Sequence, residues 1–269
     1  MADASKVKIK IKARALNESG VLIVGGTSGV GLATAMQFAA AGVTRIGLIG
    51  RNEERGKQAC EAVLKNASGI QVEFFAADAN KVDQAVRAAE QAKAKLGSID
   101  VLVNSTVAAY VPILLHDMPL ADIEAILVQQ AVAPMLMSRI VLPWMRERGG
   151  GAIINIASDA AKVTTPGETV LGAAMAAIVM FSRTLAMEAK RDGIRVNTLT
   201  PSVIEGTLTY ERVHSSAFSS KLFEKVASMA RLGIVQPDDL AAMIVFIASP
   251  QAARMTGQTI SINGGISAG

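Results

Sequence analysis

The sequence predicts an α/β protein built on a single doubly wound parallel sheet with helices on both faces. Short apolar runs alternate with helix-like stretches from residue 21 to the end, and this alternation is typical of βαβ units. A glycine-rich turn directly follows the first apolar run, where a doubly wound sheet places its ligand-binding loop. The expected strands are 21–25, 44–49, 71–77, 99–104, 151–157, 194–199 and 258–262, and the expected helices are 29–42, 52–66, 80–96, 121–148, 168–191 and 237–249.

The glycine-rich turn lies in the segment VLIVGGTSGVG, residues 21–31. Gly25, Gly29 and Gly31 form the pattern G-x-x-x-G-x-G, which supplies a tight turn, a close approach of the backbone to a pyrophosphate, and a contact between helix and strand. The pattern alone is weak evidence. Together with the alternating layout that follows it, the pattern indicates a Rossmann-like fold of dinucleotide-binding ancestry.

Composition limits the other classes of protein. With 51% hydrophobic and 19% charged residues, the chain suits one large domain, expected to span 1–269. Its apolar runs are shorter than the ~18 residues that a membrane span needs, so we expect no membrane association. The net charge of +4 is mild and no aromatic residues are interleaved with the basic ones, which excludes a nucleic-acid partner. A single cysteine, Cys60, cannot form an intrachain disulfide, and we expect a cytoplasmic protein.

Two segments stand apart from the regular alternation. Residues 1–18 form a basic extension in which lysines alternate with apolar residues, typical of an edge strand or an arm with a solvated face. A docking arm for an acidic partner or for the phosphates of CoA is the alternative. The polar segment 201–235 is expected to cover the ligand crevice as a lid, with a surface helical excursion as the alternative. The alternating lysines are Lys6, Lys8, Lys10 and Lys12.

Several further motifs resemble the classical short-chain dehydrogenase/reductase family, over roughly residues 18–265. Asp78 in FFAADAN is similar to the acidic residue that holds the adenine amino group, and Asn104 to the first, mainly structural residue of the N-N-A-G motif. The run GIRVNTLTPSVIEGT, with Pro201 and Thr207, resembles the sixth strand and the loop that meets the nicotinamide carboxamide. The closing GQTISINGG resembles the last strand of the family.

The residues that the family uses for catalysis are mostly replaced. Ser158 is retained, but the Tyr and Lys of Y-x-x-x-K are replaced by Leu171 and Met175, and the active-site Asn by Gln130. Leucine has no proton to give to a developing alkoxide, and general acid–base catalysis contributes roughly two to four powers of ten to a rate. Val107 replaces the last glycine of N-N-A-G. The resemblance therefore implies an inactive chain with remnants of a catalytic site.

The same replacements weaken the expected cofactor site. Arg51 follows the second strand where an acidic residue would bind a ribose hydroxyl, so either it meets a 2′-phosphate of NADP or it is a surface arginine. Met175 lacks an ammonium for the ribose, and Val107 narrows the approach. We expect no cofactor to be bound tightly by this chain, with NAD(P) bound by an active partner subunit.

Other side chains offer alternative chemistry. Tyr110 is either a relocated acid or a packing aromatic, and Asp159 and Glu168 form either a carboxylate site for non-redox chemistry or a solvated loop. His116 and His214 show no metal-ligand spacing, so no metal site is expected.

The expected helices 121–148 and 168–191 carry many small residues and methionines, which suits an interface between subunits. In the family these two helices form the main two-fold interface, which implies a heterotetramer with an active paralogue, and an ordinary homotetramer is the alternative. The run INIASDAAKVTTPGETVLGAAMAA resembles dehydrogenases of cyclic and aromatic hydroxyacyl-CoA thioesters, and among them the non-catalytic subunit type of (hydroxybenzyl)succinyl-CoA oxidation in toluene degradation. The alternatives are a repurposed non-redox enzyme and a ligand-sensing binding protein. The residues expected at the interface are Ala173, Ala174, Ala176, Ala177, Met180, Ala186 and Met187 on one helix, and Leu127, Val128, Met135 and Met137 on the other.

Overall fold

The protein is built around one parallel sheet of seven strands in the order β3-β2-β1-β4-β5-β6-β7. The structure is a computed structural model that describes residues 13–108, 110–213 and 215–268. Because the strand order reverses between β1 and β4, a crevice is expected beyond the carboxyl ends of these strands. The predicted fold class and all seven predicted strands are confirmed, with boundaries within a few residues. The strands are β1 Gly20–Val24, β2 Arg45–Gly50, β3 Gln71–Ala76, β4 Val101–Asn104, β5 Gly151–Ile156, β6 Ile194–Pro201 and β7 Thr259–Ile262.

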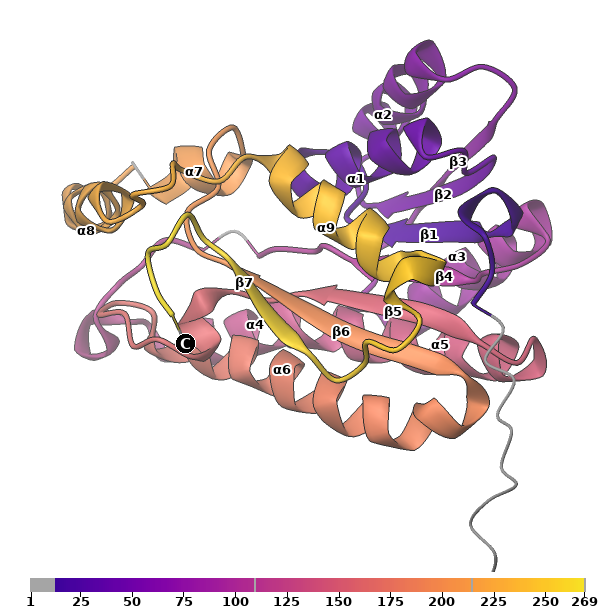
Figure 1. Ribbon diagram of the computed structural model, residues 1–269. Coiled ribbons are helices and arrows are strands. Elements are labelled where there is room, and N and C mark those ends of the chain that lie inside the picture. Colours follow the sequence, from indigo (N-terminus) through magenta and orange to yellow (C-terminus); the bar gives the residue numbers. More distant parts are fainter. Residues whose placement is uncertain (1–12, 109, 214, 269) are drawn as a thin grey trace, which may run out of the picture.

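Helices cover both faces of the sheet (Figure 1). In β1, Val21 and Ile23 pack into the core beneath α1, α2 and α9, whereas Leu22 and Val24 pack into the core beneath α3, α5 and α6. This follows from the two-residue period of a strand, and it explains why β1 is fully buried rather than alternating in polarity. The longer helices are α1 Gly29–Ala40, α2 Glu53–Asn66, α3 Val82–Leu96, α4 Leu120–Leu127, α5 Ala133–Glu147, α6 Thr169–Ala189, α7 Leu208–Val213, α8 Ala217–Ser228 and α9 Pro237–Ala248.

The helix predicted at 121–148 is divided by a π-helical turn. Helix α4 continues through Val128–Val132, which has π geometry, into α5. Such turns are rare in proteins, and those that do occur often lie at functional sites. Gln130 lies in this turn, so the irregularity falls at the predicted active-site position.

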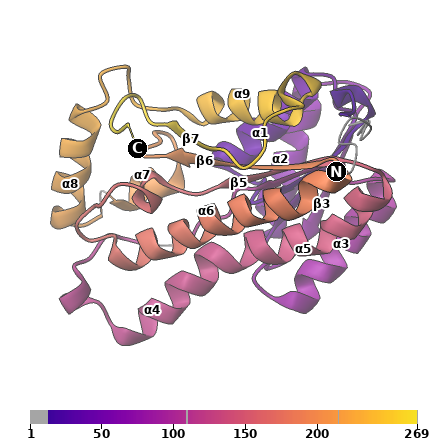
Figure 2. The same cartoon turned by 60° about the horizontal axis from the view of Figure 1, so that its bottom comes forward.

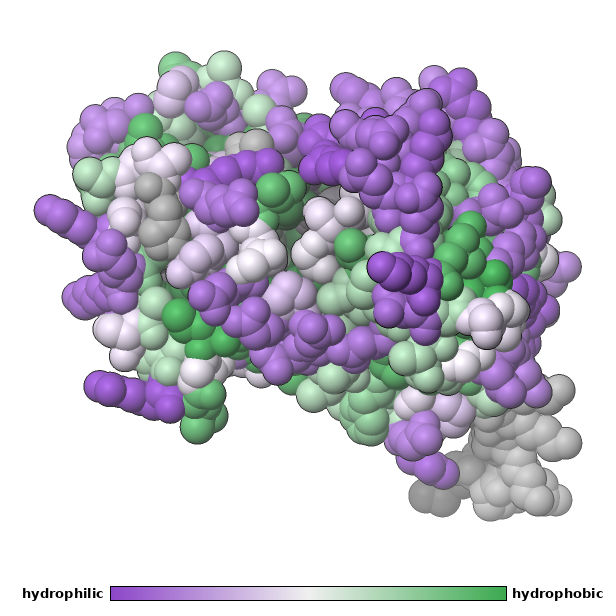
Figure 3. Space-filling view, turned by 90° about the horizontal axis from the view of Figure 1, so that it is seen from above, coloured by the Kyte–Doolittle hydropathy of each residue, from purple (hydrophilic) through white to green (hydrophobic). Residues whose placement is uncertain are grey.

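Hydrophilic residues predominate on the α2 side of the face that carries α1, α2 and α9 (Figure 3). The opposite layer, formed by α4, α5 and α6, comes forward in Figure 2. It contains two helical runs with the length and hydropathy of a membrane span, Leu120–Glu147 and Thr169–Asp192. About half of each apolar window is buried against the rest of the chain (44% and 50%), as expected for helices that cover a sheet.

Short 3-10 turns connect several elements. The basic lysines of the extension 1–18 lie outside the described residues. In the part of that extension that the structure describes, Arg14 forms an ion pair with Asp100 at 2.6 Å and thereby ties the start of the chain to the beginning of β4. The 3-10 turns are Leu16–Glu18, Leu115–Asp117, Asp159–Ala161, Lys190–Asp192 and Pro250–Ala252.

Candidate functional site

A crevice of about 300 Å³ lies at the switch point between β1 and β4. Residues that follow each of the strands β1 to β6 line it, together with the start of α6 and the helix α7. The structure brings most of the predicted site residues together here, although they are far apart in the sequence. The predicted residues that line the crevice are Gly25, Gly29, Arg51, Asp78, Gln130, Ser158, Leu171, Met175 and Thr207, with Val107, Tyr110 and Glu168.

The three glycines of the first turn have different structural roles. A Cβ on Gly25 would lie 2.4 Å from the carbonyl oxygen of Ser105, and one on Gly31 would lie 2.1 Å from the carbonyl oxygen of Gly25. Packing of the chain alone therefore requires glycine at these two positions. Gly29, with a φ of +49°, lines the crevice, and a Cβ there would meet the Thr207 side chain at 3.4 Å, an ordinary contact distance. Retention of the motif is thus partly explained by the fold itself, without a ligand.

The adenosine end of the crevice keeps groups that suit a nucleotide. Arg51 and Arg55 line it at the end of β2 and the start of α2. The Asp78 carboxylate accepts hydrogen bonds from the backbone and the side-chain amide of Asn80, at 3.0 and 3.2 Å. Arg55 was not predicted from the sequence, although its place in the first turn of α2, directly after the loop that carries Arg51, was a signal for it.

Asn104 belongs to a buried chain of polar groups rather than to the crevice wall. Its amide donates to Asn155 at 2.8 Å, the Asn155 amide donates to the Ser182 hydroxyl at 2.8 Å, and Ser182 donates to the carbonyl of Ile178. These bonds join β4, β5 and α6. Asn104 thus has a structural role, because it links the ends of β4 and β5.

The two positions where the family carries its phenol and its ammonium are apolar and buried. Leu171 is 8% exposed and Met175 is 5% exposed, and both belong to a hydrophobic cluster with Tyr110, Ile126 and Ile178. Ser158 remains at the crevice, where its hydroxyl accepts a hydrogen bond from the backbone of Ala160 at 3.2 Å. The side chains at 171 and 175 have become part of the core.

Gln130 is buried in the π-helical turn, with 1% of its surface exposed, and it lines the crevice. Its side-chain oxygen, Oε1, has no hydrogen-bond partner among the described atoms. A buried polar atom without a partner costs free energy, so such an atom at a crevice marks a place where a ligand can donate a hydrogen bond.

Tyr110 and Glu168 meet at the same crevice. The Tyr110 hydroxyl donates to the carbonyl of Gly167, the residue before Glu168. Burial raises the pKa of Tyr110, and the nearby Glu168 charge adds to this. Burial also raises the pKa of Glu168 to about 7, against which a hydrogen bond with the Thr165 side chain acts only weakly.

Asp159, the other predicted carboxylate, lies elsewhere. It is 5% exposed and accepts hydrogen bonds from Asn263 at 2.5 Å and Ser267 at 2.8 Å, so it fastens the C-terminal tail. It is neither solvated nor part of the crevice. His116 is exposed beside Asp117, and His214 lies outside the described residues. Among the described residues no group of three or more His, Cys, Asp and Glu side chains is placed to hold a metal ion.

The segment 201–235 forms helices α7 and α8 over the crevice. Tyr210 and Arg212 of α7 and Phe223 of α8 line it, which agrees with the predicted position of a lid, while movement stays a prediction. The Thr207 hydroxyl donates to the carbonyl of Ile204 at 2.9 Å and accepts from the backbone of Tyr210 at 3.2 Å. Thr207 therefore starts α7, whatever else it contacts.

These residues fit only half of a nicotinamide dinucleotide. The glycine turn, the two arginines and Asp78 suit the adenosine and pyrophosphate parts. At the nicotinamide end, Met175 cannot bind ribose hydroxyls, and Val107, which is 50% exposed, projects a branched side chain at the crevice. The side chains at 171 and 175 can neither donate a proton nor carry a positive charge.

The chain matches the family described as Enoyl-(Acyl carrier protein) reductase over residues 24–267. It is 33% identical to a D-threitol dehydrogenase of Mycolicibacterium smegmatis, with 98% of each chain covered. It is 30% identical to a 3-oxoacyl-(acyl-carrier-protein) reductase of Thermotoga maritima, covering 91% of this chain and 96% of the relative.

Among solved structures, a 7α-hydroxysteroid dehydrogenase in complex with NADH and 7-oxo glycochenodeoxycholic acid superposes with a TM-score of 0.84 and 26% identity. The superposition covers 93% of this chain and 95% of that one. The family normally binds NAD(P), and its members with assigned activities are oxidoreductases. The sheet order, the crevice at its switch point and these matches together lead to one conclusion: the chain belongs to the classical short-chain dehydrogenase/reductase family.

Proposed function

We propose that this chain is a non-catalytic subunit of a heteromeric NAD(P)-dependent short-chain hydroxyacyl-CoA dehydrogenase, in which an active paralogue binds NAD(P). The observation that carries this proposal is the burial of Leu171 and Met175 in an apolar cluster. A proton donor at 171 and a cation at 175 are what the family chemistry needs, and neither side chain can titrate. Tight binding of NAD(P) by this chain is not part of the proposal, because Met175 cannot bind ribose hydroxyls and Val107 projects a branched side chain at the crevice.

The substrate class rests on relatives and on sequence resemblance. The relative from Thermotoga maritima acts, by its name, on a 3-oxoacyl thioester. The segment 154–177 resembles dehydrogenases of cyclic and aromatic hydroxyacyl-CoA thioesters. We propose the oxidation of a (hydroxybenzyl)succinyl-CoA type substrate in cytoplasmic aromatic degradation as the reaction of the complex.

An exposed stripe on α6 supports a partner subunit. Ala173, Ala176, Met180 and Met187 follow one another at helical spacing on the solvent side, and the two methionines are each 60% exposed. Exposed large apolar side chains gathered on one helix face favour association with another protein surface. We call these four residues the α6 stripe.

The test is to prepare this chain alone and together with a related chain that has an intact Y-x-x-x-K motif. We expect the isolated chain to show no NAD(P)-dependent oxidation of hydroxyacyl-CoA thioesters, and the mixture to form a complex with activity. Turnover near ~1 s⁻¹ by the isolated chain, which is within the usual enzymatic range, would contradict the proposal.

The double variant Leu171→Tyr/Met175→Lys provides a second test of the same proposal. We expect it to gain at most slight activity, because Gln130 and Val107 also differ from the family and residues that act as a unit are not additive. Family-level rates in this variant would show that only two side chains separate the chain from a working enzyme.

A non-redox enzyme is the second candidate function, and the carboxyl of Glu168 at the crevice favours it. A group with a pKa near the working pH is suited to proton transfer. Catalysed exchange of the α-protons of a ketone in D2O by the isolated chain, abolished in Glu168→Gln, would favour this candidate over the subunit role.

A further inference from the structure

The segment after β7, residues 263–267, connects two walls of the crevice that are far apart in the sequence. It passes the loop between α8 and α9 and then reaches the 3-10 turn that follows Ser158 (Figure 1). In this turn the buried carboxylate of Asp159 accepts hydrogen bonds from the Asn263 amide and the Ser267 hydroxyl. We call residues 263–267 the strap.

Asn263 gives the strap its shape. Its amide also donates to the carbonyl of Ser267 at 3.1 Å, and its Oδ1 atom accepts from the backbone of Gly265 at 3.0 Å. Asn263 is buried, so these hydrogen bonds are shielded from competition with water. One side chain thus fixes both the turn of the strap and its attachment to Asp159.

The strap is in direct backbone contact with the loop between α8 and α9. The carbonyl of Gly264 accepts a hydrogen bond from the backbone of Leu232 at 3.0 Å. Gly264 has a φ of +66°, and a Cβ there would lie 2.0 Å from the carbonyl oxygen of Gly233. Only glycine allows this approach, so a larger residue at 264 would separate the two segments.

This loop belongs to the base of the predicted lid, the segment 201–235. Ile204 and Val235 form a parallel bridge, and the backbone of Glu205 donates to the Val235 carbonyl at 3.0 Å. The side-chain amide of Gln236 donates to the Glu205 carboxylate at 2.7 Å. These bonds bring the two ends of the segment together, so the lid has a closed base that the strap contacts on one side.

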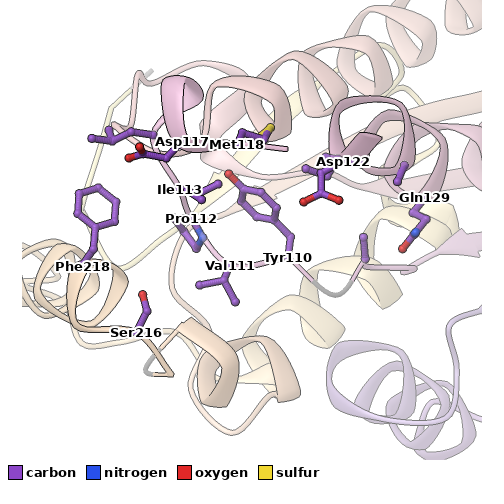
Figure 4. A pocket seen from close by; sticks show the side chains of 14 residues that line it. Tyr110, Val111, Pro112, Ile113, Asp117, Met118, Asp122, Gln129, Ser216 and Phe218 are labelled. Atoms are coloured by element: carbon purple, nitrogen blue, oxygen red, sulfur yellow. The ribbon is translucent and has the colours of Figure 1, made fainter. Parts of the chain in front are cut away.

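Beyond its base the lid is lightly packed. Of the described residues, α7 buries only Val213 and α8 only Ser219. Phe218 of α8 borders a cavity of about 580 Å³ that adjoins the crevice, with Asp122 and Gln129 on the far side (Figure 4). Segments with few buried contacts open at a low cost in free energy. We therefore expect α7 and α8 to open more easily than the base.

We propose that the strap fixes the base of the lid to the turn after Ser158 and thereby confines movement of the lid to α7 and α8. Ser158 and Ile204 both line the crevice, so the strap also sets the spacing of two of its walls. Asp159 is a positioning residue in this device, because it acts on the lid only through the strap. The device needs neither NAD(P) nor a partner subunit, so it is independent of the proposed function.

The first test is Asn263→Ala, which removes the bond to Asp159 and the turn of the strap together. Hydrogen–deuterium exchange of the purified chain is measured by mass spectrometry well below the melting temperature. We expect amides in 230–236 and in 157–162 to exchange about tenfold faster, as the loss of one buried hydrogen bond implies. Exchange in β1 should stay unchanged.

Asn66→Ala is the matched control. The Asn66 amide donates to the carbonyl of Ala62 at 2.8 Å on α2, near the edge of the sheet opposite β7, so this variant loses the same group away from the strap. Its exchange in both regions should equal that of the original chain. Limited cleavage by trypsin after Arg231, an exposed residue in the base of the lid, is a second readout and should be accelerated by Asn263→Ala alone.

Gly264→Val tests the other contact of the strap. Its side chain displaces the strap from Gly233 but leaves the hydrogen-bonding groups around Asp159 in place. We expect faster exchange in 230–236 and faster cleavage after Arg231 in this variant as well.

Two results overturn the proposal. One is unchanged protection of 230–236 in both folded variants, and the other is faster exchange in Asn263→Ala that is confined to 157–162. Faster exchange in β1 as well would mean that the whole chain unfolds in Asn263→Ala. Ser267→Ala, which removes a single bond to Asp159, then takes its place under the same two criteria.

Discussion

At the scale of single residues, the replacements at positions 171 and 175 fit their apolar surroundings. A leucine and a methionine at positions 171 and 175 contact Tyr110 and other apolar groups, so they add to the core that they border. Reintroducing a phenol or an ammonium there would place polar groups against that apolar cluster, where each needs a new hydrogen-bond partner. Glu168, in contrast, is a titratable group in poor contact with water, and the effect of its raised pKa on stability can be measured.

The raised pKa of Glu168 predicts that the folded chain loses stability as pH rises. A carboxyl whose folded pKa is about 7, against an ordinary value of 4.5, binds its proton more tightly in the folded state. The protonated form therefore stabilises the fold below pH 4.5, and this advantage is lost between about pH 4.5 and 7. The full difference amounts to up to about 3 kcal/mol. Glu168→Gln removes the titration, so the variant should become progressively more stable than the original chain between pH 5 and 8.

Thermal melts of both proteins at several pH values measure this difference directly. Because all other groups titrate in both proteins, subtracting the two curves isolates Glu168. Glu90→Gln makes the same chemical change at an exposed position of α3 and is the matched control. A flat difference for Glu168→Gln would mean that the carboxyl is well hydrated in the folded state.

At the scale of secondary-structure elements, strands were easier to predict than the details of helices. Each buried strand is a short apolar run bounded by polar or glycine residues, a local signal. The π turn at Val128–Val132 leaves no such signal, because the apolar spacing of α4 and α5 continues across it. The segment with α7 and α8 was expected as a polar lid or a surface helical excursion, without bounds for its helices, because the six residues of α7 are too few to show a helical period.

The site was predictable where it depends on motif positions and not where it depends on distant contacts. Ser158, Gln130 and Leu171 were located by counting along the chain, and the structure brings them to one crevice. Asp159 was misplaced because its partner Asn263 lies 104 residues away, at the C-terminal tail. The cavity of about 580 Å³ beside the crevice was missed for the same reason. Its walls come from two distant parts of the chain, residues 108–129 and the segment with Ser216 and Phe218.

The end of α9 depends on a single buried side chain. Arg195 on β6 is 7% exposed, and its guanidinium donates to the carbonyls of Ile247, Ala248 and Ala252 at 2.5, 3.0 and 3.1 Å. The bonds to Ile247 and Ala248 satisfy carbonyls at the end of α9 that lack helical partners, whereas the Ala252 carbonyl also accepts a bond from the backbone of Met255 at 2.9 Å. Burial lowers the pKa of Arg195 to about 10, which still leaves it charged at neutral pH.

Arg195→Met should therefore destabilise the chain by about 3 kcal/mol, because it leaves buried carbonyls without donors while keeping most of the side-chain volume. For a chain of this size we expect the melting temperature to fall by roughly 10 °C. Arg87→Met, at an exposed position of α3, is the control and should change it by little. An equally small effect for both variants would show that water replaces the guanidinium at the end of α9.

At the scale of the whole molecule, the layer formed by α4, α5 and α6 carries the surface that we propose for a partner subunit. The structure corrects part of the predicted interface, because Ala174, Ala186 and Met137 are fully buried in the chain's own core. Ala177 is also partly buried against the apolar cluster of the crevice. A charge at any of these four positions would disturb the fold itself, so it could not report on assembly. The α6 stripe is the part of this helix that remains for a partner.

Met180→Glu is consequently the sharper test of assembly. Met180 is 60% exposed, so a glutamate there is hydrated in the isolated chain and the fold should be unaffected. In a complex packed on the α6 stripe, the same carboxylate is buried without a counter-charge, which costs several kcal/mol and should dissociate the subunits. Leu64→Glu makes the same change in chemistry at a 44% exposed position on α2, on the other face of the sheet, and should leave the complex intact. Light scattering on both variants, mixed with the active paralogue, gives the mass of the assembly. A complex that survives Met180→Glu but dissociates with Leu64→Glu would transfer the interface to the opposite layer, and one that survives both would remove the α6 stripe as the basis for a subunit role.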